Sequence, residues 1–128
     1  MYHSSFNPDE LINRAFAVNL DQTTAFCRLL SDPTRIRLLS LLRDKELTVA
    51  EITRVTQLAQ SRVSTHLAKL REAGLLRDRR SGVSVFYRFD ATSLQTKDAQ
   101  LWNTLLEQTS DPMLVGDQQR LLELLAAR

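Results

Sequence analysis

The stretch LAQSRVSTHLAKLREAGLL, residues 58–76, places a ladder of apolar residues along one side of a predicted helix. On a helical wheel of about 100° per residue, the residues within about 40° of Val63 are all small or apolar: Ala59, Leu67, Leu70 and Gly74. We expect this side to be buried. Gly74 is expected to end the helix, as a glycine just beyond a helix C-terminus commonly does.

The opposite side of the same helix is short and free of acids over its first two turns. It carries Ser61, Thr65 and Ala68, with Glu72 at the far end; Arg62 and Lys69 flank it on one side and Ser64 on the other. Small side chains let a helix approach the base edges of DNA, hydroxyls can bond to bases or phosphates, and an arginine can reach a guanine. This face is typical of a DNA-recognition helix, although an ordinary amphipathic helix whose surface lacks acids would show the same pattern.

The segments on either side supply the rest of a winged helix-turn-helix. TVAEITRVT, residues 48–56, predicts a short helix capped by Thr48, and TQLA, residues 56–59, is the turn. After Gly74 the period changes, and LLRDRR and VSVFYRF, residues 75–80 and 83–89, predict two strands joined by a turn at Arg80-Ser81-Gly82. The second strand alternates two sets of residues: Val83, Val85, Tyr87 and Phe89 against Ser84, Phe86 and Arg88. This alternation favours packing of Tyr87 and Phe89 on the core.

The remaining segments predict further helices, so the fold class is mainly α. LSDPTRIRLLSLL gives a strong start signal, with Ser31 or Asp32 as N-cap and Pro33 in the first turn, and its apolar residues predict a buried central helix. The other expected elements are a helix over Pro8–Val18, a helix over Leu20–Leu30, a connector DKEL at 44–47, a helix over Thr96–Thr109, a break at SDPMLVG (110–116) and a terminal helix at 117–128. Cys27 falls on the apolar stripe of the second helix and is expected to be buried.

Composition places these elements in one domain of 128 residues with 43% hydrophobic content. The net charge is only +2, but residues 53–90 hold eight Lys/Arg against three Asp/Glu, whereas both flanking segments are slightly acidic. A basic segment of this kind is expected of a surface that binds a polyanion, although a solvated face of no consequence would look alike.

Several function classes are disfavoured. The sequence has no run of about 20 apolar residues for a membrane span, and MYHSSFNPDE does not resemble a secretory signal. The single cysteine, Cys27, excludes an intrachain disulfide and suits a reducing compartment, so we expect a cytoplasmic protein. No nucleophile and base pair or phosphate loop is visible, so we expect neither an enzyme nor a cofactor.

We therefore expect DNA contacts from the helix and from the hairpin, where the arginines are expected at or near the tip. The candidate residues are Gln60, Ser61, Arg62, Ser64, Thr65, His66, Lys69, Arg77, Arg79 and Arg80. His66 lies about 60° from the buried centre of the wheel, so structural support or a phosphate contact is favoured over a metal-ligand role.

Four motifs in the same order resemble the ArsR/SmtB family of bacterial and archaeal winged-helix repressors: SDPTRIRLLSLL, ELTVAEI, QSRVSTHLAKLREAGLL and RRSGVSVFYRF. The resemblance covers about residues 20–109, leaving an N-terminal extension at 1–19 and a helical C-terminal extension at 110–128. It implies a homodimer that binds an imperfect palindrome and is released by an effector. The implied interface lies on the helices before and after the helix-turn-helix and wing, at Leu20, Phe26, Leu30, Leu101, Trp102 and Leu105.

The sequence departs from the metal-sensing members of that family. They carry paired cysteines in the segment that matches ELTVAEI, where this chain has Thr48 and Ala50. Other members place Asp and His ligands on the helix after the wing, and residues 96–109 contain no His. We therefore expect no metal site and an effector of another kind. Ala59 also stands where relatives often have a capping Ser, so the recognition helix could begin at Gln60 or Ser61.

Two other functions are compatible with the sequence. Winged helices can use the same surfaces to hold partner proteins, which the modest net charge permits. The stretch after the wing also resembles that of relatives fused to an S-adenosylmethionine-dependent methyltransferase, although this chain has no glycine-rich nucleotide-binding motif. The terminal helix would then lead into a second domain, or it would extend the dimer interface.

Overall fold

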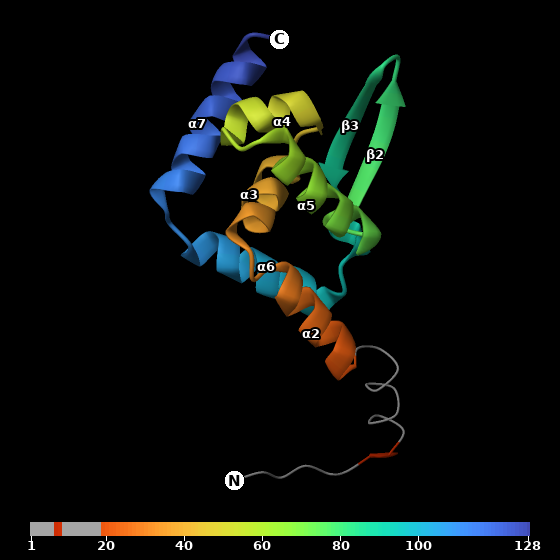
Figure 1. Ribbon diagram of the computed structural model, residues 1–128. Helices are drawn as coiled ribbons and strands as arrows, with labels where there is room; N and C mark the ends of the chain where they lie inside the picture. Colours follow the sequence, from red (N-terminus) through yellow and green to blue (C-terminus); the bar gives the residue numbers. More distant parts are fainter. Residues whose placement is uncertain (1–6, 9–18) are drawn as a thin grey trace.

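The computed structural model describes residues 7–8 and 19–128 (Figure 1). In chain order its elements are α2 Leu20–Leu29, α3 Pro33–Leu42, β1 Leu47–Thr48, α4 Val49–Thr56, α5 Gln60–Glu72, β2 Leu76–Ser81, β3 Ser84–Phe89, a 3-10 turn at Ala91–Ser93, α6 Thr96–Gln108 and α7 Pro112–Ala126. The helix predicted over Pro8–Val18 lies outside the described residues apart from Pro8. The mainly helical fold with a hairpin wing is confirmed.

Helix α3 is the centre of the core, as its leucines predicted. The helix begins where the sequence predicts. The Asp32 carboxylate accepts a hydrogen bond from the Thr34 amide at 2.7 Å as the N-cap, and Pro33 occupies the first turn. The four leucines that follow are at most 1% exposed: Leu38, Leu39, Leu41 and Leu42. Helices α5 and α7 and strand β3 pack around α3 (Figure 1).

The helix-turn-helix consists of α4, a three-residue turn at 57–59, and α5. The side chains of Thr48 and Glu51 cap α4 reciprocally, each accepting a hydrogen bond from the other's backbone amide. Gln57 ends α4 in the left-handed conformation, with φ 61°, and turns the chain toward α5. At the far end of α5, Gly74 adopts φ 80° and the Leu75 amide donates to the Leu70 carbonyl, as in a Schellman motif.

The wing differs from prediction at its tip. Strands β2 and β3 pair antiparallel with Ser81 opposite Ser84, so the two turn residues are Gly82 and Val83, later in the chain than the predicted Arg80-Ser81-Gly82. Gly82 has φ 61° at the first turn position, where a tight hairpin turn commonly requires a positive φ. Val83 is fully exposed at the tip.

A third strand lies within the segment predicted as a connector. Leu47 and Thr48 of β1 pair with Tyr87 and Phe86 of β3, which gives the sheet order β1-β3-β2. A strand of two residues is too short to show a periodicity, which is why the sequence did not reveal it. The pairing joins the middle of strand β3 to the residue that caps α4.

The C-terminal helix is longer than predicted. Asp111 accepts a hydrogen bond from the Met113 amide and Pro112 occupies the first turn, so α7 begins at Pro112 and the predicted break at 110–116 is largely helical. The Asp-Pro pair is the same start signal that correctly predicted α3, so the predicted break over residues 110–116 is wrong from Pro112 onward. Leu121 and Leu124 of α7 are buried in the common core.

Helix α2 packs more sparingly than predicted. Among its own residues only Phe26 is buried, and Cys27 is exposed, so the prediction of a buried cysteine is wrong. Cys27 follows Phe26 by about 100° around the helix and therefore turns away from the core. Near α2 lies α6, from which Lys97 donates a hydrogen bond to the Thr23 hydroxyl (Figure 1).

Candidate nucleic-acid interface

The buried side of α5 is the one that the sequence predicts. Val63, Leu67 and Leu70 are at most 2% exposed, and they anchor α5 in the core shared with α3 and α4. The helix begins after Ala59, which offers no side-chain cap hydrogen bond to the first turn. The first amides of α5 therefore remain without a side-chain acceptor.

The outward side of α5 is exposed over its whole length: Gln60, Ser61, Arg62, Ser64, Thr65, Ala68 and Lys69. The Thr65 hydroxyl donates to the Ser61 carbonyl at 2.8 Å, so Thr65 presents its oxygen as an acceptor. Within the described part of the chain, neither Arg62 nor Lys69 is in ion-pair contact with a carboxylate. Their charges are therefore available to an external anion.

His66 lies on the flank of α5, and its ring faces other residues of the protein rather than the solvent. Its ring is 12% exposed; Nδ1 lies 3.4 Å from Arg35 Nη1, and Nε2 lies 4.0 Å from an Asp32 carboxylate oxygen. Arg35 in turn donates to the backbone carbonyls of Arg28 and Leu29. His66 thus lies at the junction of α2, α3 and α5.

Burial lowers the pKa of His66 below the ordinary value of 6.5. Asp32 opposes this shift by favouring the protonated ring, whereas the nearby cations Arg35, Lys69 and Arg62 act in the same direction as burial. The folded protein therefore holds His66 preferentially in its neutral form at this junction.

The three wing arginines predicted as a cluster near the tip occupy different environments. Arg77 lies at the base of the hairpin opposite Arg88 and forms an ion pair with Asp90, so its predicted place near the tip is wrong. Arg79 pairs with Glu46 at 2.6 Å and lies over the Phe86 ring, 4.9 Å from its centroid. Sequence reasoning missed this because Glu46 is 33 residues away in the chain.

Arg80 lies nearest the tip of the three and pairs in register with Val85. No carboxylate in the described ranges 7–8 and 19–128 forms an ion pair with it. Hydrogen bonding from Arg79 lowers the pKa of Glu46, and the Thr92 hydroxyl together with Arg77 lowers that of Asp90, so both partner carboxylates are charged at neutral pH. Of these three predicted arginines, Arg80 is therefore the one without a carboxylate partner in the described structure.

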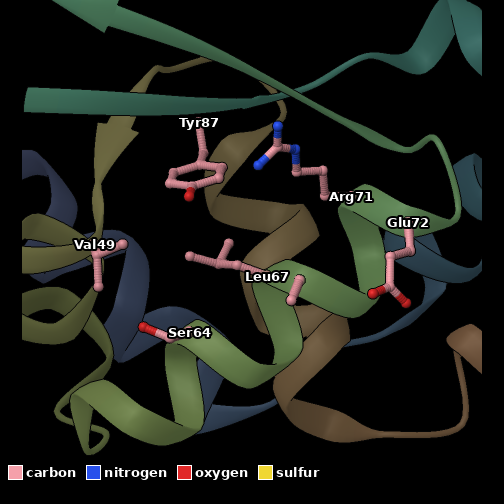
Figure 2. Close-up of a pocket in the computed structure, with 7 residues that line it drawn as sticks. Val49, Ser64, Leu67, Arg71, Glu72 and Tyr87 are labelled. Carbon is pink, nitrogen blue, oxygen red and sulfur yellow. The ribbon is translucent and has the colours of Figure 1, made fainter.

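A hollow of about 380 Å³ lies between the recognition helix and the wing (Figure 2). Figure 2 shows the Arg71 guanidinium and the Tyr87 ring at its upper side and Ser64 at its lower side. Arg71 and Tyr87 were not among the predicted site residues. Arg71 could have been found, because it is seven residues after Ser64 and so lies on the same flank of α5.

The described residues contain neither a metal-binding cluster nor a membrane-spanning helix. No three His, Cys, Asp or Glu side chains of residues 7–8 and 19–128 gather closely enough to hold a metal ion. Within the same ranges, no helix has both the length and the apolar character needed to cross a bilayer.

Comparison with known proteins matches residues 32–78 to the model of the bacterial regulatory protein, ArsR family. The arsenic resistance transcriptional regulator ArsR1 of Pseudomonas putida is 47% identical over 75 residues, which cover 58% of this chain and 59% of that protein. The transcriptional activator HlyU of Vibrio cholerae is 32% identical over 77 residues, 60% of this chain and 71% of HlyU. The transcriptional repressor SdpR of Bacillus subtilis is 32% identical over 68 residues, covering 53% of this chain and 76% of SdpR.

The fold is also similar to solved structures. Reduced HlyU from V. cholerae superposes with a TM-score of 0.60 and 25% identity, covering 80% of this chain and 99% of that chain. These relatives are transcriptional regulators and not enzymes. The matched family region, residues 32–78, contains α3, the helix-turn-helix and the start of the wing.

We predict that His66 makes stability depend on pH. Because its pKa is lower in the folded chain than the ordinary 6.5, the unfolded chain binds the proton first as pH falls. The stabilisation is complete above that value and is lost as pH falls through 6.5 toward the folded pKa. Urea unfolding at about pH 7.5 and about pH 5.5 should show a smaller loss of stability for His66→Gln than for the wild type. His3→Gln serves as the control, and an equal loss in all three proteins would contradict the assignment.

Proposed function

Because the chain belongs to the ArsR family of bacterial regulatory proteins, we propose that it is a sequence-specific, double-stranded DNA-binding regulator that acts as a homodimeric repressor. The observation that carries this proposal is the exposed outward side of α5, which carries no acid over its first two turns and on which Arg62 and Lys69 are free of carboxylate partners in the described structure. A helix of this kind fits the major groove, which is about 12 Å wide. Such a role would place the protein in the cytoplasm.

The residues divide into those that read bases and those that hold the backbone. Gln60, Ser61, Arg62, Ser64 and Thr65 lie on the first turns of α5, where side chains reach base edges. Lys69 and Arg80, which have no carboxylate partner in the described structure, are assigned to phosphate contacts. Arg77, Arg79 and His66 are already engaged with groups of the protein, so we assign them to the support of the site.

We predict that Arg62→Ala costs about 1 to 3 kcal/mol on the preferred site and relaxes preference at one base position. The comparison variant is Arg80→Ala, which removes the same charge but should weaken all sequences alike and reduce the salt slope by about one. Selection from a random duplex library followed by binding titrations across salt concentrations measures both effects. Unchanged affinity and preference in Arg62→Ala would refute the groove assignment, and no binding of any duplex at low salt would favour a protein-interaction module.

The homodimer is proposed to form through α2 and α6. Leu20, Leu101 and Leu105 are 79%, 37% and 42% exposed, an apolar surface without a partner in the described part of a single chain. A solved winged helix-turn-helix domain of Mycobacterium bovis with this fold is described as homodimeric. Phe26 and Trp102 are buried within the protomer, where Trp102 packs against Phe89, so we assign them to the support of this surface. Leu30 is half-buried beside them.

We predict that Leu101→Glu/Leu105→Glu converts the dimer to a monomer, because it would bury two carboxylates in an apolar interface. Sedimentation should give twice the 14.6 kDa chain mass for the wild type and the single mass for the variant. Leu122→Glu, at a leucine of α7 that is 67% exposed, is the matched control. Dissociation by Leu122→Glu alone would place the interface on α7 and contradict the assignment.

Two such recognition helices, related by the dimer axis, suit an imperfect palindrome in a promoter. Repression would result from occupancy of that promoter, and an effector that binds the dimer would relieve it. The absence of cysteines at Thr48 and Ala50, the family's metal-binding positions, favours an effector other than a metal ion.

We predict that the purified protein lowers transcription from a promoter that carries the selected site, and that metal salts do not restore it. Run-off transcription with and without the protein measures the first effect, and addition of metals, thiol oxidants and S-adenosyl compounds tests release. A rise in transcription on adding the protein would identify an activator instead. Release by a metal salt would contradict the assignment of a non-metal effector.

A further inference from the structure

The last carbonyl groups of α4 receive hydrogen bonds from arginines that belong to other helices. Arg37 of α3 donates through Nη2 to the Thr56 carbonyl at 2.7 Å, and Arg120 of α7 donates through Nε to the Val55 carbonyl. Carbonyls in the last turn of a helix have no partner within that helix, and cations near this end are stabilised by the helix dipole. Arg37 and Arg120 therefore cap the helix that leads into the helix-turn-helix turn.

Both arginines are held by one buried carboxylate, Asp117 of α7. Arg37 donates to its two oxygens at 2.8 Å each, and Arg120 donates to Oδ1 at 3.0 Å. Asp117 is 1% exposed and Arg37 7%. A bidentate pair of this kind fixes orientation as well as distance, so α7, α3 and the end of α4 have one mutual arrangement.

The other end of α4 is also attached to α7. Arg128 donates to both oxygens of Glu51, the residue that caps α4 together with Thr48, and to the Glu46 carbonyl. This contact is partly exposed and should contribute less than the buried one. Helix α7 thus packs against α4, and Arg120 of α7 and Arg128 just beyond it are hydrogen-bonded near opposite ends of α4 (Figure 1).

The buried contact lies directly before the turn that sets the direction of α5. Gln57 follows Thr56 in the left-handed conformation, and only 57–59 separate the anchored carbonyls from the first residue of the recognition helix. A small rotation at the end of α4 would be carried into the whole of α5, because α5 is a rigid helix. Base contacts require positions within a fraction of an ångström, whereas packing of the core tolerates more.

We propose that Asp117, Arg37 and Arg120 are positioning residues for DNA recognition, and that α7 fixes the turn of the helix-turn-helix. This inference rests on the proposed function for its effect on DNA, but the attachment of the turn can be tested without DNA. Helix α7 lies outside the family region 32–78, so the assignment concerns a part of the chain that the family model does not cover.

Two variants separate positioning from stability. Arg120→Met removes the donor to Val55 and leaves the Arg37–Asp117 pair in place. The double variant Arg37→Met/Asp117→Leu replaces the buried pair with apolar side chains of similar size, a change that commonly preserves stability. Arg43→Met is the matched control, because Arg43 pairs only with its exposed neighbour Asp44 in the described structure and loses the same charge.

The first measurement is amide hydrogen exchange at temperatures where each protein is fully folded. The Gln57 amide, bonded to Thr53, and the Val63 amide, bonded to Ala59, report on the turn and on the start of α5. We expect both to exchange about tenfold faster in the two test variants, with amides of α3 unchanged and Arg43→Met identical to the wild type. Wild-type exchange at Gln57 and Val63 in both variants would overturn the inference.

The second measurement is the affinity ratio between the duplex selected by the wild type and a scrambled duplex. We expect this ratio to fall about tenfold or more in the folded test variants, the size of one lost base contact, and to be unchanged in Arg43→Met. Wild-type discrimination in variants with a loosened turn would overturn the positioning role. If the wild type selects no duplex, DNA binding itself is refuted, and the exchange measurement still decides whether α7 holds the turn.

Discussion

The burial of α3 on nearly every side is the constraint on which the rest of the structure depends. Its leucines leave almost no surface to water, so α5, α7 and β3 must each cover a part of it. A helix with this little exposed circumference cannot shift without opening the core. Helix α5 is therefore attached to a deeply buried helix, and its outward side chains can be polar and short because its inward ones secure it.

The sequence was informative wherever a pattern is local. The periodicity of residues 58–76 predicted the buried face of α5, the Asp-Pro pair predicted the start of α3, and Thr48 as an N-cap predicted the start of α4. The same signal at Asp111-Pro112 marks the start of α7, but a break was predicted over residues 110–116, a segment that ends in Gly116. Near a helix start, one glycine costs only about 1 kcal/mol and does not end the helix.

The parts that could not be predicted depend on residues far apart in the chain. The pairing of Arg79 with Glu46 and that of Arg37 with Asp117 join segments 33 and 80 residues apart, and neither follows from spacing. The strand at Leu47–Thr48 exists because β3 lies beside it. Likewise, Cys27 lies on a predicted apolar stripe but is exposed, because α2 offers the core only one buried side chain of its own.

The internal pairing of the wing has a consequence for how the protein would search a chromosome. Of the eight cations in residues 53–90, three are paired with carboxylates and five are unpaired within the described structure: Arg54, Arg62, Lys69, Arg80 and Arg88. Non-specific residence time on DNA rises with each phosphate neutralised. Because three of these cations are already paired within the protein, its affinity for non-specific DNA would be lower and it would dissociate sooner from non-cognate sequences. The protein would therefore sample many sites faster.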